Sequence, residues 1–158
     1  SKVSKSGKVI GIDMTDEMLY KARKNAKEGN YTNVEFRKGD IENNIPVDNN
    51  TVDAVISNCV INLTSDKTGA FREVHRILKQ GGRMVISDLV TDREIEHGQV
   101  NADQWCSCID GALTKENYIQ SIKKAGFENV DVLEERTYME GEKVNGRKIS
   151  SLVIRAIK

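Results

Sequence analysis

The chain has 158 residues, which suits one domain, and we expect residues 1–158 to form a single domain. Hydrophobic residues make up 38% and charged residues 30%, a balance typical of globular rather than disordered proteins. Lysine plus arginine and aspartate plus glutamate are both 24, so the zero net charge argues against a nucleic-acid partner. The apolar runs are far shorter than the roughly 20 residues that span a bilayer, and no signal peptide is visible.

Three cysteines, Cys59, Cys106 and Cys108, form an odd set without a secretory signal. This pattern favours reduced thiols in the cytoplasm over a disulfide framework. The chain opens without methionine and soon enters a predicted strand, so we expect it to be a fragment that is incomplete at its N-terminus.

The first half of the chain alternates apolar runs with one amphipathic segment. Residues 8–13 end in an acid and predict a short buried strand. Thr15 is a good N-cap for a helix that we expect to end at Gly29. The other elements expected here are a strand at 34–37, a polar loop at 39–50 and a buried strand at 52–58.

The second half continues this alternation and then ends in two strands. We expect a helix from about 65 to 78 that the glycines at 81 and 82 terminate, followed by a strand at 83–88. Residues 90–112 show no clear periodicity. The last elements expected are a helix at 115–125, closed by Gly126, and strands at 130–135 and 149–157. These two strands predict an antiparallel pair because no helix separates them.

Alternating strands and helices predict an α/β fold with a mainly parallel sheet and an antiparallel C-terminal strand pair. In such sheets, ligands bind beyond the carboxyl ends of the strands. We therefore expect the functional residues in the loops after Ile12, Arg37, Asn58 and Asp88.

Two acids at this edge are typical of an adenosine site. Asp13 ends its strand, where a carboxylate can accept hydrogen bonds from a ribose diol, and the flexible Met14 can lie against an adenine face. Asp40 follows the next strand and can accept a bond from an adenine amine. Alternatively, Asp13 caps the following helix and Asp40 caps a turn. A nicotinamide dehydrogenase also places an acid here, but it needs a glycine-rich loop that this chain does not contain.

Two segments resemble the class I S-adenosylmethionine-dependent methyltransferases. Residues 8–19 (KVIGIDMTDEML) are similar to the second strand and helix of that family. Residues 71–83 (FREVHRILKQGGR) are similar to its helix and "LKPGG" turn, with Gln80 where proline is usual. The resemblance implies a Rossmann-like sheet and S-adenosylmethionine as cofactor, with Gly39, Ile41 and Asn58 joining Asp13, Met14 and Asp40 in its site.

Two further segments resemble the arsenite methyltransferases. Residues 57–63 (SNCVINL) look like their loop after the fourth strand, and residues 108–113 (CIDGAL) look like their second cysteine motif. The resemblance implies that thiolates of Cys59 and Cys108 bind trivalent arsenic, the substrate of arsenic detoxification. Arsenic is thiophilic, and its lone pair can attack a sulfonium methyl without a general base. The protein then mainly positions the atoms, roughly 3 to 3.5 Å apart.

Other roles for the thiols remain open. Free cysteine is often a small buried hydrophobe, and Cys106 is expected to be incidental. Zinc bound through Cys106 and Cys108 would need a second ligand pair, which the sequence does not offer at the usual spacing. Neither histidine is expected to be a metal ligand, since His75 should be partly exposed on a helix and His97 should be solvated. Trp105 covers the acceptor pocket or belongs to the core.

The family's glycine-rich first motif and its N-terminal cysteines have no counterpart here. In the family's sheet, the missing first strand lies between the strands of Val9 and Val55. We therefore expect the isolated chain to bind S-adenosylmethionine weakly or not at all, and to self-associate or rearrange a strand to cover its open edges. A small-molecule arsenic–thiol adduct and a thiol reductant are the expected partners. The alternatives are a quinone C-methyltransferase and an inactive adenosine-binding or interaction domain.

Overall fold

The computed structural model describes residues 3–4, 6–94, 109–138, 144 and 146–158. In chain order the elements are β1 (Val9–Asp13), α1 (Asp16–Glu28), β2 (Val34–Lys38), β3 (Val52–Asn58), the 3₁₀ helix η1 (Ile61–Leu63), α2 (Lys67–Ile77), β4 (Leu78–Thr91), α4 (Lys115–Lys124), β5 (Glu128–Tyr138) and β6 (Ile149–Ile157). Every strand expected from the sequence is present, and α1 lies between the predicted N-cap Thr15 and the predicted C-cap Gly29.

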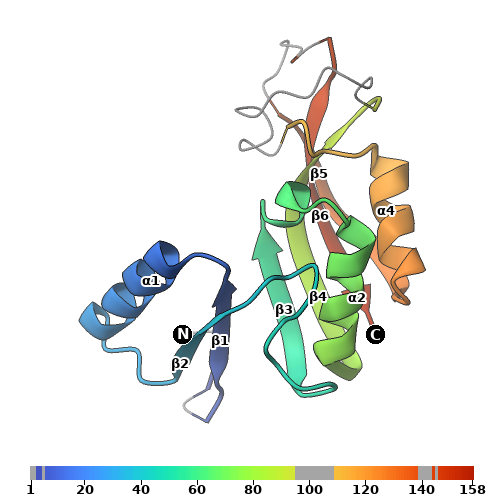
Figure 1. Ribbon diagram of the computed structural model, residues 1–158. Helices are drawn as coiled ribbons and strands as arrows, with labels where there is room; N and C mark the ends of the chain where they lie inside the picture. The colour runs from blue at the N-terminus through green and yellow to red at the C-terminus, as the bar shows by residue number, and fades with distance from the viewer. Residues whose placement is uncertain (1–2, 5, 95–108, 139–143, 145) are drawn as a thin grey trace.

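The strands form two sheets (Figure 1). β1 and β2 are a parallel pair, and a four-stranded sheet has the order β3-β4-β6-β5. β3 is parallel to β4, whereas β6 is antiparallel to both β4 and β5. The α/β class and the antiparallel C-terminal strand pair are therefore confirmed.

The helix expected at about 65–78 is present as α2, but the expected cause of its termination was wrong. Helix α2 ends at Ile77, before the glycine pair that was expected to terminate it. Leu78 is extended, with ψ of 139°, and its backbone pairs with Val52, so strand pairing ends the helix. The two glycines instead lie inside β4, where the register with β3 shifts and where Gly81 takes a φ of 75°.

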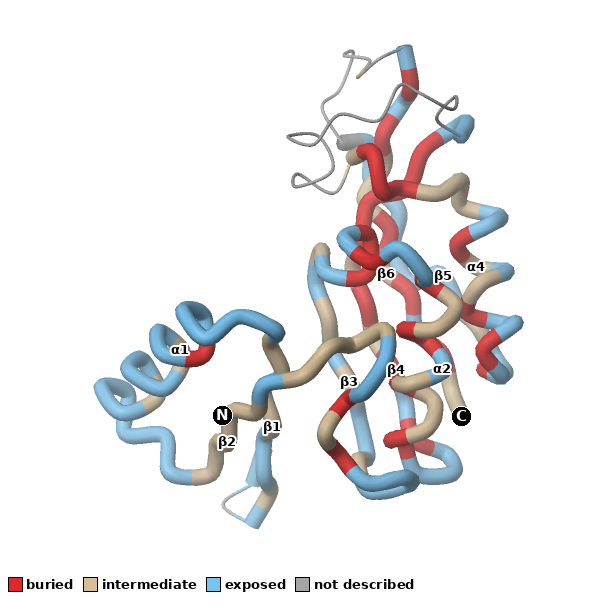
Figure 2. The backbone as a smooth tube through the Cα atoms, viewed as in Figure 1, coloured by how far each residue is buried: buried red, intermediate tan, exposed pale blue. Residues whose placement is uncertain are grey.

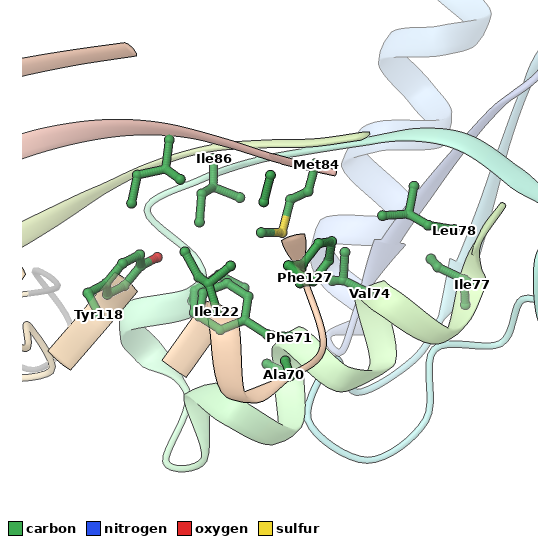
Figure 3. Packing of buried hydrophobic residues seen from close by; sticks show 14 of the residues in the cluster. Ala70, Phe71, Val74, Ile77, Leu78, Met84, Ile86, Tyr118, Ile122 and Phe127 are labelled. Carbon is green, nitrogen blue, oxygen red and sulfur yellow. The ribbon is translucent and has the colours of Figure 1, made fainter. Parts of the chain in front are cut away.

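The core lies between the four-stranded sheet and helices α2 and α4, as Figure 3 shows. Phe71 of α2 and Tyr118 of α4 meet edge to face, with ring centroids 5.6 Å apart. Both side chains face Met84 and Ile86 of β4, which are almost completely buried. Ile10 and Ile12 of β1 pack against the same core and so attach the two-stranded sheet to it.

The neighbouring edges of β1 and β3 belong to different sheets. Within the described residues, β1 pairs with β2 alone and β3 with β4 alone. Ile56 in the middle of β3 is 85% exposed, and Figure 2 shows β3 and most of α1 in the colours of exposed and intermediate residues. An apolar strand residue of this kind is normally covered, so the exposed edge of β3 is an unusual feature of the described residues.

A buried carboxylate lies near the carboxyl end of β4. Asp88 is 1% exposed and accepts a hydrogen bond of 2.5 Å from the Tyr118 hydroxyl. Its Oδ1 atom has no hydrogen-bond partner among the described residues. Burial raises the pKa of Asp88 from its usual value of 3.8 to about 6, against the opposing effects of the Tyr118 hydroxyl and the Lys67 ammonium. The carboxylate therefore destabilises the folded state once it ionises.

We expect Asp88→Asn to remove a pH dependence of stability. Because the pKa is raised in the folded state, the stabilisation from this group is complete below pH 3.8 and is lost as the pH rises through about 6. The difference in unfolding free energy between the variant and the wild type should therefore change by up to about 3 kcal/mol from pH 4 to pH 8, with the variant gaining relative stability at pH 8. Urea unfolding at both pH values measures the difference, and a pH-independent difference would contradict the assignment.

Candidate functional site

The loops at the carboxyl ends of the strands are joined in two pairs. After β1 and β2, the Gly39 amide donates to the Asp13 carbonyl over 3.0 Å. Just after β3, the Cys59 amide donates over 2.9 Å to the carbonyl of Ser87, which lies within β4. Glu42 connects the two pairs, because its carboxylate accepts hydrogen bonds from the Ser65 amide and, over 2.9 Å, from the Ser65 hydroxyl. The predicted ligand edge is therefore one connected set of loops.

Asp13 is bonded to the residue that precedes α1 through one of its two carboxylate oxygens. Its Oδ1 atom accepts bonds of 2.8 Å from the Thr15 amide and hydroxyl, which fixes the entry to α1. Its Oδ2 atom has no hydrogen-bond partner in the described part of the chain, so this oxygen can accept a ligand hydroxyl. Met14 beside it is 67% exposed and leaves its thioether accessible.

Asp40 organises a tight turn. Its two carboxylate oxygens accept bonds from the Glu42 amide at 2.9 Å and from the Asn43 side chain at 2.6 Å. These bonds lower the pKa of Asp40, so it stays charged and keeps further lone pairs for an amine. Gly39 is needed for close approach, since a Cβ there would lie 2.4 Å from Pro46 Cδ. Ile41 packs against the main core.

A clamp on this loop was not predicted from the sequence. The guanidinium of Arg76 donates to the carbonyls of Ile45 and Val47, each over 2.8 Å, and pairs with Glu73 at 2.7 Å. Glu73 also accepts a bond of 2.9 Å from the Ile45 amide. The available signal was the i,i+3 spacing of Glu73 and Arg76 on α2, but that spacing does not show which loop the pair binds.

Cys59 has an unusual backbone conformation. Its φ is 53°, in the left-handed region that non-glycine residues rarely adopt. The side chain is half-buried and is not in a disulfide. It packs against a small apolar cluster, defined by Leu89, Ala112 and Ile149, that Ile109 and Val144 also contact. Such local strain is often kept at functional positions.

Asn62 fixes the same loop and was also missed. It is completely buried, and its side-chain amide donates to the Leu89 carbonyl over 2.7 Å. Asn58, the last residue of β3, is exposed at the ligand edge. The structure thus brings Asn58 and Cys59 together at the end of β3, next to the end of β4.

Several predicted positions fall elsewhere. Cys106, Cys108, His97 and Trp105 lie outside the described residues. His75 is half-buried, lies edge-on to Phe127 at 5.2 Å, and has its pKa lowered by burial. Over the described ranges, no group of three or more His, Cys, Asp or Glu side chains could hold a metal ion. None of the described helices is long and apolar enough to cross a membrane.

Comparison with known proteins gives similarities over most of the chain. The sequence pattern of a family described as "Methyltransferase domain" matches residues 1–126. An arsenite methyltransferase from Halobacterium salinarum is 41% identical over 132 residues, which are 83% of this chain and 34% of that protein. A demethylmenaquinone methyltransferase from Lactococcus lactis is 36% identical over 83 residues, which are 52% of this chain and 32% of that protein.

A solved structure supports the same relationship. The arsenic(III) S-adenosylmethionine methyltransferase from Chlamydomonas reinhardtii superimposes with a TM-score of 0.85 at 30% sequence identity. The similarity covers 99% of this chain and 57% of that one. The predicted methyltransferase fold is thereby confirmed, while the chain spans about a third of the length of the Halobacterium protein.

We expect Cys59→Gly to be more stable than Cys59→Ala by about 1 kcal/mol, because glycine adopts a left-handed backbone without steric cost. Because both variants lack the thiol, the difference in their stabilities reports the cost of the left-handed backbone at position 59. The matched pair is Ser57→Gly and Ser57→Ala in the extended strand β3, where glycine should be the less stable by about 0.5–1 kcal/mol. Urea unfolding of all four variants measures these stabilities. If glycine is less stable than alanine at both positions, Cys59 is not strained.

Proposed function

Because the chain belongs to the methyltransferase domain family, we propose that it serves methyl transfer from S-adenosylmethionine to trivalent arsenic held by Cys59 and Cys108. The observation that carries the proposal is the packing around Cys59. Cys59 contacts the same apolar cluster as Ile109, which directly follows Cys108 in the chain. The relatives from Halobacterium and Chlamydomonas, which act on arsenic, support this substrate.

The described residues fit the adenosine part of the cofactor. The Oδ2 atom of Asp13 can accept a ribose hydroxyl, and Met14 offers an exposed apolar surface for the adenine. Asp40 offers a charged acceptor for the adenine amine, and Gly39, Ile41 and Asn58 are the further residues that we assign to this site. When bound, S-adenosylmethionine supplies an electrophilic methyl group, and the lone pair of arsenic is the nucleophile that accepts it.

The role of the chain's own residues is to bind and orient the arsenic. Thiolates are soft ligands that suit a thiophilic centre, and two of them from distant positions in the sequence would fix its position. No side chain has to remove a proton, because the nucleophilic lone pair carries none. A thiol reductant would keep both sulfurs and the arsenic reduced, which agrees with a cytoplasmic location.

A second candidate is methylation of a quinone carbon. The similarity to the demethylmenaquinone methyltransferase, 36% over 83 residues, favours it. Such a reaction would use the same cofactor edge but would not require paired thiols. Arsenite binding therefore distinguishes the two functions.

We expect the reduced chain to bind arsenite, and Cys59→Ser and Cys108→Ser each to weaken binding at least roughly tenfold, because one lost thiolate converts a chelate into a single bond. Cys106→Ser is the matched control and should bind like the wild type. Equilibrium dialysis with a phosphine reductant avoids competing thiols. Unchanged affinity in both serine variants would favour the quinone reaction.

We expect this 158-residue chain to bind S-adenosylmethionine weakly or not at all. The residues proposed for the adenosine part are among those described, but the edges of β1 and β3, which pair with no further described strand, leave no described loop for the methionine part. The same edges favour self-association. Calorimetric titration measures the affinity, with Asp13→Ala as the comparison, and sedimentation measures the mass. Micromolar binding by a monomer would contradict both expectations.

A further inference from the structure

A buried ion pair joins the segment after Cys108 to the start of β6. Arg147 Nη2 lies 2.5 Å from Asp110 Oδ1, and the two side chains are 3% and 0% exposed. Removing both charges from water costs several kcal/mol per ion, which their attraction need not repay. In addition, the Nε and Nη1 atoms of Arg147 have no hydrogen-bond partner among the described residues. A buried ion pair of this kind is weak evidence for stability, and fixing the position of a segment is a role that such a pair can serve.

Arg147 is a firm anchor for the pair. Its amide and carbonyl exchange hydrogen bonds of 3.0 and 3.1 Å with Val144. The next residue, Lys148, is held by Asp92 just beyond β4, through bonds of 2.9 Å to its amide and 3.2 Å from the Asp92 amide to its carbonyl. The guanidinium therefore projects from backbone that two separate contacts fix.

At the other end of the pair, Asp110 belongs to residues 109–113, which pack against the loop of Cys59. Gly111 packs so closely on the Asn62 carbonyl that a Cβ would lie 1.9 Å from its oxygen. Ala112 belongs to the small cluster that Cys59 contacts. The Leu113 carbonyl accepts a bond of 3.0 Å from the Thr91 amide. Asp110 lies within this docked stretch, two residues after Cys108 in the chain.

We propose that Asp110 and Arg147 are positioning residues that hold residues 109–113 against the Cys59 loop and so set the affinity of the chain for trivalent arsenic. The inference rests on the proposed function. Chelation by two thiolates depends on the effective concentration of the second sulfur, which falls when its segment is free to move. An ion pair has fixed geometry and partner, whereas apolar packing alone tolerates a shift of the segment.

The test measures arsenite binding by equilibrium dialysis with the reduced 158-residue chain. Asp110→Asn leaves the Arg147 charge without its buried partner. The double variant Asp110→Leu, Arg147→Met removes both charges and keeps apolar volume, an exchange that buried ion pairs often tolerate. The matched control is Asp131→Asn, which breaks the half-exposed 2.7 Å pair with Arg155 between β5 and β6. Urea unfolding gives the stability of each variant.

The expected result is a loss of arsenite affinity of at least roughly tenfold in both Asp110 variants, with wild-type affinity in Asp131→Asn. The double variant should show this loss even with wild-type stability, which a purely structural role would not produce. If the double variant recovers both its stability and its arsenite affinity, the positioning role is wrong, whereas the proposed function is unaffected. Binding in the wild type that Cys59→Ser does not weaken would overturn the proposed function and, with it, this inference.

Discussion

The carboxyl-terminal half of β4 provides the backbone groups that hold the Cys59 loop and residues 109–113, the acceptor side of the candidate site. Every second residue in this part of β4 makes one such bond. The Ser87 carbonyl accepts from the Cys59 amide, and the Leu89 carbonyl accepts from the Asn62 side chain. The Thr91 amide donates to the Leu113 carbonyl. β4 is itself fixed by β3 on one side and β6 on the other. Segments that are distant in the sequence therefore share one rigid reference.

Local patterns were sufficient to predict most elements and the edge where the candidate residues gather. Thr15 and Gly29 stand at the two ends of α1 as expected, although the Thr15 side chain makes no capping bond and its hydroxyl donates to Asp13 instead. The end of α2 could not be read in this way, since the pairing of Leu78 with Val52 decides it. Likewise, Asp110 and Arg147 are 37 residues apart, and no local pattern connects them.

The two halves of the candidate site differ in how they are held. The cofactor side relies on charged side chains that bind backbone groups, such as Arg76 on the loop after β2. The acceptor side relies on buried polar groups and on a strained backbone at Cys59. The Arg76 and Glu73 side chains are 29% and 17% exposed, against 3% and 0% for Arg147 and Asp110, so salt should screen the first pair more than the second.

The contact between Gly111 and the Asn62 carbonyl restricts which residues this position can hold. Any side chain at 111 would collide with a backbone oxygen, which cannot swing aside as a flexible side chain can. A chain that replaces this glycine must therefore dock the segment differently. Position 111 consequently offers a simple criterion for sorting newly sequenced proteins: those with glycine in register can keep this arrangement of the two loops, and the others cannot.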